Sequence, residues 1–491
     1  MAYTGTDLNH ASRGWVKSRS AVNVLDYGAV GDGVTDDTEK IQDAIDSNRG
    51  YISLPVGTYI ISSPIKLNKN CILIGQSAGA YFADEGYTRN TVIKPSADFV
   101  GDAAIIADPA DVGAGVYYYG LAVQNLLIDL YNVKDDSVGG IILRSVSNTE
   151  TFHDIKIINN NSGNAILIEK SGNAGAFECD GLNFYNIYCL SADNTTPSGT
   201  PVLKINSGNE IVFRDCKFQG QSSTNAGSIS TEIKAEASST INAVTFDNCS
   251  FTGSETGISI ESTASSSQGI RWVRMINNTF EGPKYAINVK GTSSKPTQFC
   301  SLFGNRWQTT QTNGIFLRLQ EYTSNNNQIF VDEYNIGDYT VLIEANANYN
   351  TIFGYPTTIS NSGTGNIIIG RSSSSLSVNN LSPTVITQNS WTAPTLLNSW
   401  ANASPSNRTS AGYRKDATGR VFLRGYLGSG TYAYPNYIFQ LPSGYRPVKP
   451  YVIGAYSAGG QTLITILDDG NVFATGGSGN LSLDGISFSL D

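Results

Sequence analysis

The chain has 491 residues, of which 40% are hydrophobic and 10% aromatic, so it can bury a core and is not a disordered polymer. Only 15% are charged, against about a quarter in average proteins, while 50 glycines and many Asn, Ser and Thr residues favour β-structure over helices. The net charge of −9 argues against nucleic acid or an anionic membrane surface as the main partner.

The six cysteines and two histidines also exclude classes of protein. No two cysteines form a CxxC pair, so we expect free thiols that serve as small core residues rather than a zinc site or a disulfide framework. Two histidines exclude a His-rich metal site. No apolar stretch reaches the roughly 18 residues of a membrane span, and the N-terminus does not resemble a signal peptide, so we expect no membrane insertion.

The N-terminal region begins with residues 1–20, which show no periodic pattern and which we interpret as an attachment segment. A helical pattern follows over residues 35–46, with Thr35 or Asp36 as its N-cap. Ile41, Ala44 and Ile45 would form one apolar face of this helix. Such a face can cover the open end of a β-structure and protect its strand edge.

Three segments around this helix resemble the N-terminal signature of the pectate-lyase-like superfamily, which recurs in tailspike and appendage proteins of bacteriophages. They are Asn23–Thr38 (NVLDYGAVGDGVTDDT), Tyr51–Tyr59 (YISLPVGTY) and Cys71–Gly75 (CILIG). The resemblance implies a right-handed parallel β-helix whose helix-capped start spans residues 21–80. Asp32, Asp36 and Asp37 fall inside the cap, and we interpret them as structural.

A repeat organises residues 81–371, the predicted body of the β-helix. Short runs that alternate apolar and polar residues recur every 27 to 33 residues, beginning at Leu126, Ile155, Leu182, Ile211, Val244, Val273, Cys300 and Ile329. A second alternating run follows each of them. Several short strands per repeat, without helices, predict a solenoid whose coils stack about 4.8 Å apart.

Aligning the repeats predicts three columns of structural residues. One is a ladder at a bend: Asn160, Cys216, Cys249, Asn278 and Asn305. A second is an interior aromatic stack: Ser162, Phe218, Phe251, Phe280 and Trp307. The third is a solvated face of mostly alternating charge, which could instead line a ligand site: Arg144, Glu169, Asn206, Glu236, Glu261, Lys290, Arg318 and Glu344.

Candidate catalytic residues gather near the first run of consecutive repeats: His153, Asp154, Glu178, Asp180 and Glu210. The alignment predicts that Asp154 and Glu210 share a column two coils apart, about 9–10 Å, near the upper limit for an inverting pair of carboxylates. Asp180 would lie one coil from Asp154, nearer the retaining distance. β-Elimination would instead need a base, together with a cation or calcium ion that acidifies the proton beside a uronate carboxyl group.

Candidate substrate-binding residues lie close to these carboxylates. One outward column is predicted to hold Asp129, Tyr185, Arg214 and Asp247, with Asp215 directly after Arg214. An aromatic ring beside an arginine and carboxylates suits a sugar-binding groove. The alternative is that each is an ordinary solvated residue of a sheet face.

The C-terminal part differs in character from the repeats. Residues 372–395 are rich in Ser and Asn and form a predicted linker, and residues 396–491 show short strands between turn signals, as in an antiparallel β-sandwich or jelly roll. The segments Gly412–Gly425 and Phe439–Pro447 resemble C-terminal domains of phage tail-fibre and appendage proteins, which implies trimerisation or carbohydrate binding. Four tyrosines could stack on sugars or pack at a subunit interface: Tyr432, Tyr434, Tyr437 and Tyr451.

Together these features predict a homotrimeric phage tailspike that binds and cleaves a host surface polysaccharide, which could be a capsule, an exopolysaccharide or a teichoic acid. Hydrolysis is preferred over lyase chemistry because carboxylates outnumber basic candidates. We expect no cofactor for hydrolysis and a calcium ion if the enzyme is a lyase. The expected location is the virion, with tail or baseplate proteins as partners, on the outer side of the host envelope. A non-cleaving receptor-binding adhesin and a secreted or prophage-borne carbohydrate enzyme are the alternatives.

Overall fold

The computed structural model is an all-β chain that divides into two compact units, residues 1–367 with 373–383 and residues 368–372 with 384–491. It describes residues 21–47, 50–79, 90–111, 116–147, 149, 151–172, 176–191, 200–221, 226–236, 239–263, 269–295, 297–298, 300–308, 314–320, 327–331, 340–354, 358–363, 365–370, 385–387, 390–403, 408–416, 419–428 and 430–490.

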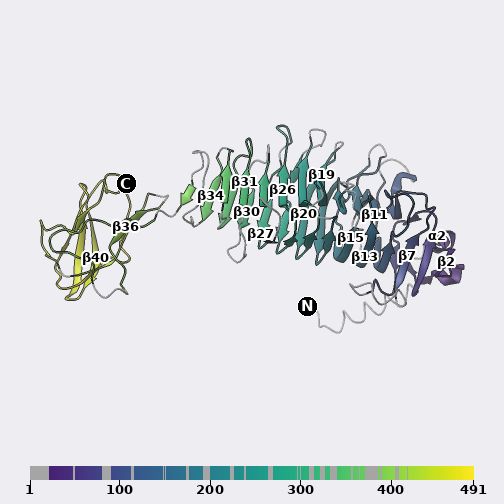
Figure 1. The fold of residues 1–491 in the computed structure, drawn as a ribbon, viewed down its shortest axis with the longest axis horizontal. Helices are drawn as coiled ribbons and strands as arrows, with labels where there is room; N and C mark the ends of the chain where they lie inside the picture. The colour runs from purple at the N-terminus through teal and green to yellow at the C-terminus, as the bar shows by residue number, and fades with distance from the viewer. Residues whose placement is uncertain are drawn as a thin grey trace, which may run out of the picture. The chain divides into compact units, whose positions relative to one another are not determined.

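The described strands of the repeat region form parallel sheets in which each coil pairs with the next, as a parallel β-helix requires (Figure 1). The first sheet has one strand per coil: β5 (Ile65–Lys66), β8 (Ala103–Ala107), β11 (Gly139–Arg144), β14 (Ile166–Glu169), β16 (Leu203–Ile205), β19 (Ile229–Ala235), β22 (Thr256–Ser262), β26 (Tyr285–Lys290), β29 (Ile315–Leu319), β31 (Thr340–Ile343) and β33 (Thr358–Asn361).

The second sheet contains more strands than the first because many coils contribute two short strands to it, while others contribute one bent strand. Its strands are β1 (Val22–Asn23), β2 (Asp32–Asp36), β3 (Tyr51–Ser53), β4 (Gly57–Ile61), β6 (Ile72–Ile74), β7 (Thr91–Pro95), β10 (Ala122–Asp129), β13 (Phe152–Asn160), β15 (Asn183–Ser191), β17 (Gly208–Arg214), β18 (Lys217–Gln219), β20 (Ile241–Asp247), β21 (Ser250–Thr252), β23 (Ile270–Arg271), β24 (Arg274–Ile276), β25 (Thr279–Glu281), β27 (Ser301–Phe303), β28 (Arg306–Gln308), β30 (Gln328–Val331), β32 (Thr351–Gly354), β34 (Ile367–Gly370) and β35 (Val385–Thr387). A separate pair joins β9 (Tyr118–Tyr119) to β12 (Val146–Ser147).

Two columns of residues with left-handed backbone bend these strands. We call the first the asparagine bend: Asn125, Asp154, Asn186, Asp215, Asn248, Asn277 and Gly304. We call the second the glycine bend: Gly181, Glu210, Ala243 and Trp272. Asn, Asp and Gly tolerate positive φ better than other residues, which explains the composition of the first column. Glu210, at φ 50°, is an unusual occupant of the second.

The interior of the coils is filled by stacked aromatic rings. Phe218, Phe251, Phe280 and Trp307 pair in one register, as predicted, and the Phe251 and Phe280 ring centroids lie 5.0 Å apart. The predicted ladder is confirmed for four members. Cys216 and Cys249 align, and the side-chain amide of Asn278 donates to Oδ1 of Asn305 at 2.9 Å.

The first members of both predicted columns were wrong. Asn160 pairs with Ser191 at the end of β13, and the residue of that strand in register with Cys216 is Ile155, through Ile187. Ser162 follows β13 and donates its backbone N–H to Asp136 instead of entering the aromatic stack. Because β13 and β15 continue unbroken past the asparagine bend, they contain an extra stretch that the alignment of apolar runs did not separate.

The predicted charge column is corrected at two positions. Lys234, not Glu236, lies between Asn206 and Glu261, and Arg318 pairs with Asn288, two residues before the column. In the observed register Glu236 is no longer the neighbour of Glu261 in this column. Glu261 lies instead between Lys234 and Lys290, at 3.9 and 3.8 Å. These contacts favour the interpretation as a solvated, charge-paired face.

The cap contains α2 (Thr38–Asp46), preceded by the short 3-10 helix η1 (Val24–Tyr27); another, η3 (Pro109–Asp111), lies farther along the chain. The predicted apolar face is confirmed, since Ile41, Ala44 and Ile45 are buried. The helix begins three residues later than predicted because Asp36 belongs to β2. Buried Asp37 accepts backbone hydrogen bonds from Val30 and Gly31 at 2.6 and 3.0 Å, as a structural carboxylate should.

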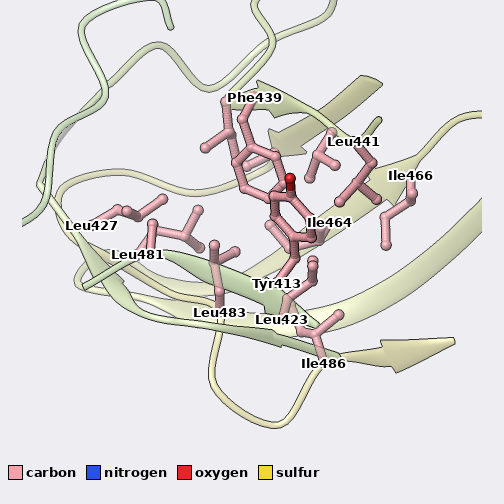
Figure 2. Close-up of a cluster of buried hydrophobic side chains, with 14 of the residues drawn as sticks. Tyr413, Leu423, Leu427, Phe439, Leu441, Ile464, Ile466, Leu481, Leu483 and Ile486 are labelled. Carbon is pink, nitrogen blue, oxygen red and sulfur yellow. The ribbon is translucent and has the colours of Figure 1, made fainter. Parts of the chain in front are cut away.

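Residues 390–490 of the second unit form two antiparallel sheets. One contains β36 (Gly412–Lys415), β37 (Val421–Arg424) and β44 (Ser487–Phe488), and the other contains β38 (Tyr426–Leu427), β39 (Phe439–Gln440), β40 (Tyr451–Ser457), β41 (Gly460–Ile466), β42 (Asn471–Thr475) and β43 (Leu481–Ser482). Strands of both sheets contribute to one hydrophobic core (Figure 2), in which Tyr413 and Leu423 meet Phe439, Ile464 and Leu481. The described part of the chain has no helix long and apolar enough to span a lipid bilayer.

Candidate functional site

The predicted site residues fall at three places in the first unit. Six lie on or beside the asparagine bend: His153, Asp154, Tyr185, Arg214, Asp215 and Asp247. Three lie on or beside the glycine bend: Glu178, Asp180 and Glu210. Asp129 lies apart from both. Residues that were predicted from the sequence to form one site therefore lie on different surfaces of the first unit.

The predicted pairing of Asp154 with Glu210 is wrong. Asp154 is in register with Asn186, and Asn186 with Asp215. Glu210 is in register with Gly181, five residues before Asn186, which at about 3.3 Å per residue separates the two columns by roughly 16 Å. The runs at Leu126 and Ile155 belong to one column and those at Leu182 and Ile211 to another. Both alternate apolar and polar residues in the same way, so alternation alone could not distinguish them.

Carboxylates alternate with amides along the asparagine bend. Asn186 donates from Nδ2 to Oδ1 of Asp154 at 2.5 Å, and Asn248 donates to Asp215 at 2.5 Å. The other oxygen of Asp154 lies 2.8 Å from Nδ1 of His153. Both oxygens of Asp154 therefore have partners within the protein, and His153 is held by its own neighbour.

A cavity of about 350 Å³ opens at the first coils of this bend. It is lined by Gln76, Ser77, Ala78, Gly79, Asn125, Asp154, Ile155, Lys156, Asn186 and Tyr188. Burial lowers the pKa of Lys156, which makes its amine easier to deprotonate. Lys156 and Tyr188 pair on neighbouring coils. Neither residue was predicted from the sequence, although each is the outward residue that follows an apolar residue just past the bend.

An outward column runs beside the asparagine bend, and the predicted grouping of Tyr185, Arg214 and Asp247 is confirmed. The column also contains His153 and Gln124. Tyr185 is exposed, and Nε of Arg214 lies 3.2 Å from Oδ2 of Asp247. Because Arg214 and Asp247 pair with each other, the ring of Tyr185 is the flat surface that remains accessible in this column.

Asp129 does not belong to that column, so its predicted place was wrong. It pairs with Ile158 on the far side of the bend, is 1% exposed, and lies 3.4 Å from Nζ of Lys94. Nδ2 of Asn159 donates to it at 2.6 Å. Such a buried, paired carboxylate stabilises the coil and is closed to a ligand.

The carboxylates at the glycine bend form a different environment. Asp180 pairs with Asn209 of the next coil, and Glu210 follows Asn209 directly. Burial raises the pKa of Asp180, and the negative charge of Glu210 raises it further. Glu178 is engaged by the protein, because it accepts hydrogen bonds from the Ser207 hydroxyl and from the backbone N–H of Thr240. Asp180, with its raised pKa, and Glu210 on the neighbouring coil are thus the two carboxylates that the glycine bend brings together.

The four tyrosines of the second unit divide into two groups. Tyr432 and Tyr451 pack against the core of that unit, and the Tyr432 hydroxyl donates to the carbonyl of Gly479 at 2.8 Å. Tyr434 is exposed and meets Tyr437 and Phe473 edge to face. Tyr434 and Tyr437 therefore keep the sugar-stacking interpretation open, whereas Tyr432 and Tyr451 have packing roles.

The likeness to known proteins extends over the part of the first unit that contains its predicted site residues. A family model described as rhamnogalacturonase A/epimerase, pectate lyase-like, matches residues 21–284, more than half of the 491 residues. A probable glucan endo-1,3-beta-glucosidase of Arthroderma benhamiae is 24% identical over 295 residues, which are 48% of this chain and 32% of the fungal protein.

Phage proteins match a shorter part of the sequence. The preneck appendage protein of Bacillus phage PZA is 45% identical over 74 residues, 15% of this chain and 7% of the phage protein. The chain thus aligns with about a third or less of the length of these curated relatives. The solved N-terminal fragment of gene product 12 of bacteriophage phi29 superimposes with a TM-score of 0.51 at 17% identity, over 77% of this chain and 68% of that one, a likeness of fold alone.

Proposed function

Because the chain belongs to the rhamnogalacturonase A/epimerase, pectate lyase-like family, we propose that it binds a bacterial surface polysaccharide along its β-helix and hydrolyses it. Asp180 and Glu210 are the proposed catalytic pair. A capsule, an exopolysaccharide and a teichoic acid are the candidate polymers. Relatives among phage appendage proteins support a place in the virion tail, and a homotrimer attached through tail or baseplate proteins is part of the proposal.

One observation carries the proposal: the pKa of Asp180 is raised by burial and by Glu210 on the neighbouring coil. Hydrolysis of a glycosidic bond needs one protonated and one ionised carboxyl group. Protonated Asp180 would donate its proton to the departing glycosidic oxygen while the carboxylate of Glu210 attacks the anomeric carbon from the opposite face of the sugar. Water, deprotonated by Asp180, would then hydrolyse the glycosyl ester on Glu210. Asp180 and Glu210 lie on adjacent coils, about 4.8 Å apart, and are offset by one residue along the strand, a separation comparable with the roughly 5–5.5 Å between the carboxyl groups of a retaining pair.

A second reaction is favoured by the cavity at the asparagine bend. Lys156, whose pKa is lowered by burial, lies there with Tyr188 and Asp154. A lysine with lowered pKa is a suitable base for removing the proton beside a uronate carboxyl group. In that case the protein would be a polysaccharide lyase, with a calcium ion as the expected aid. In the described residues, no three His, Cys, Asp or Glu side chains gather into a metal-binding group.

The test incubates the full chain with purified capsule, exopolysaccharide and wall teichoic acid. New reducing ends or released teichoic fragments report hydrolysis, and ultraviolet absorbance of unsaturated uronates reports elimination. We expect Asp180→Asn and Glu210→Gln each to lower hydrolysis by about 10²–10⁴-fold. Glu281→Gln, at an exposed strand position, is the matched control and should retain full activity.

Three outcomes contradict the proposal in different ways. Full hydrolysis by both carboxylate variants would move the catalytic site elsewhere. Unsaturated products that disappear in Lys156→Met would replace hydrolysis by elimination at the asparagine bend. Tight binding without any fragments would make the protein an adhesin.

A further inference from the structure

Two arginines lie side by side on the outer face of the smaller sheet of the second unit. Across strands β36 and β37, Arg414 pairs with Phe422, and Gly412 pairs with Arg424. Cross-strand partners lie on the same side of an antiparallel sheet, and successive residues alternate between its sides. Because Tyr413 belongs to the hydrophobic core, both arginines lie on the face that the core does not cover.

One indole ring contacts both guanidinium groups. The guanidinium carbons of Arg414 and Arg424 lie 4.6 and 4.4 Å from the centroid of the Trp391 ring, distances typical of cation–π contacts. The backbone next to this ring is fixed, since Thr392 and Tyr413 exchange two hydrogen bonds of 2.9 Å. We call Arg414, Arg424 and Trp391 the arginine site, in which two like charges are held close together.

A glycine provides the space for this arrangement. A Cβ atom at Gly412 would lie 3.2 Å from Nε of Arg424 and 3.3 Å from Cε3 of Trp391. Any larger residue would therefore press on the arginine or on the ring. The close approach of these two side chains to the sheet thus depends on a residue without a side chain.

The charges of the arginine site are not neutralised within the protein. In the described part of the chain, neither Arg414 nor Arg424 has a carboxylate at ion-pair distance, and the Nε atom of each is buried without a hydrogen-bond partner. Asp416 and Asp484, two nearby carboxylates in the sequence, accept backbone hydrogen bonds at 3.0 and 2.9 Å instead. Arginines in this condition retain the capacity to bind an anionic group.

The second unit also differs in charge from the rest of the chain. Residues 384–491 contain seven Lys or Arg residues and five Asp residues, whereas the whole chain has a net charge of −9. In the first unit, Arg144 and Arg318 lie 2.7 and 2.6 Å from carboxylate oxygens. Unpaired stacked arginines are therefore not a general consequence of the composition of this protein.

We infer that the arginine site binds the phosphate group of a sugar phosphate ester. A guanidinium that stacks on a ring keeps the N–H groups at its edge for a ligand in its plane. A tetrahedral phosphate has enough oxygens to accept from two such groups, whereas one guanidinium fork already satisfies a carboxylate. The negative charge of the whole chain disfavours a long polyanion such as duplex DNA. The inference concerns the second unit and does not depend on the hydrolysis proposed for the first.

The test measures binding by the full chain at low ionic strength, using titration calorimetry. The probes are glucose 1-phosphate, glycerophosphoglycerol, inorganic phosphate, glucuronate and duplex DNA. We expect saturable binding of at least one phosphate ester, weaker binding of inorganic phosphate and glucuronate, and no binding of DNA. Arg414→Gln and Arg424→Gln should each weaken ester binding about tenfold, because each removes charge-assisted hydrogen bonds. Trp391→Phe should bind more tightly than Trp391→Ala, because a ring remains to hold the guanidinium groups.

The matched control is Arg306→Gln, which removes the same charge from an exposed position of the first unit and should bind like the parent. Thermal melts check the fold of the variants: the ester should raise the melting temperature of the parent but not that of the Arg414→Gln, Arg424→Gln double variant. Undiminished ester binding by both arginine variants, or no ester binding by the parent, would overturn the inference. Glucuronate or inorganic phosphate that binds as tightly as the esters, or tight binding of DNA, would overturn the assignment of the ligand.

Discussion

At the scale of single residues, Asp180 is held in an environment that disfavours its own charge. Burial and the neighbouring Glu210 both raise its pKa, and only the backbone N–H of Gly181 opposes them. Asp154 and Glu178 differ, since each accepts hydrogen bonds from side chains or backbone that satisfy its oxygens. A partly buried carboxylate that lacks such hydrogen bonds lowers the stability of the fold, which makes Asp180 a candidate catalytic residue.

Asp180→Asn should raise the melting temperature at pH 7 while abolishing cleavage. A raised pKa in the folded state means that folding favours the protonated form, so the stability contributed at low pH is lost as pH rises through that pKa. The asparagine cannot ionise, so the variant should melt at a higher temperature than the parent at pH 7 and at the same temperature at about pH 3. Thermal melts at the two pH values test this.

Asp154→Asn is the matched comparison for that experiment. Its carboxylate accepts from Asn186 and faces His153, so the substitution should lower the melting temperature at pH 7. A lower melting temperature for Asp180→Asn at pH 7 would show that Asp180 is an ordinary structural carboxylate.

At the scale of elements, apolar alternation could predict the strands but not which strands share a register. The aromatic column from Phe218 to Trp307 was predictable because bulky rings recur at one position in successive repeats. Each positive-φ bend, however, restarts the alternation on its far side. Asp154 and Glu210 therefore lie in the same local alternation of apolar and polar residues although they belong to different bends. The cavity beside Asp154 could not be predicted either, because residues 76–79, which line it, lie outside the repeats.

The amide ladder inside the coils should be sensitive to a single truncation. Oδ1 of Asn305 accepts from both the backbone N–H and the side-chain amide of Asn278, and Nδ2 of Asn305 donates to the carbonyl of Met275. Asn305→Ala would leave these buried groups unpaired and should lower the free energy of unfolding by roughly 2–3 kcal/mol. Denaturant unfolding measures the change, and exposed Arg306→Ala should show almost none. Equal stability of the two variants would mean that the ladder contributes nothing.

At the scale of the whole molecule, a low-charge sequence forms two units with separate cores, and the helical cap, the β-helix and the antiparallel C-terminal sheets were all predictable from patterning. The six cysteines follow the same logic, since all are free and buried. Burial raises the pKa of Cys71, Cys179 and Cys300 to about 12. Their place as small core residues, expected from their scatter along the sequence, is confirmed.

Thiol chemistry gives a measurement of the assembled fold. At pH 8 the native chain should react with none of its six thiols on the timescale of minutes, because all six are buried and inaccessible to the reagent. After unfolding in guanidinium all six should react. Rapid modification of one thiol in the native protein would reveal local opening of its coil.

Because the coils stack at a regular spacing, the distance between two outward residues of one column depends on the number of coils between them and not on local geometry. Arg214 and Asp247 occupy equivalent positions on adjacent rungs, so excising residues 215–247 would rejoin the backbone at matching points. Tyr119 and Arg271 would then be separated by four coils instead of five. Two outward residues on either side of the deletion would lie one coil, about 4.8 Å, closer together. If the proposed polysaccharide binds across both, a correspondingly shorter oligomer should suffice, as a titration with oligomers of defined length would show.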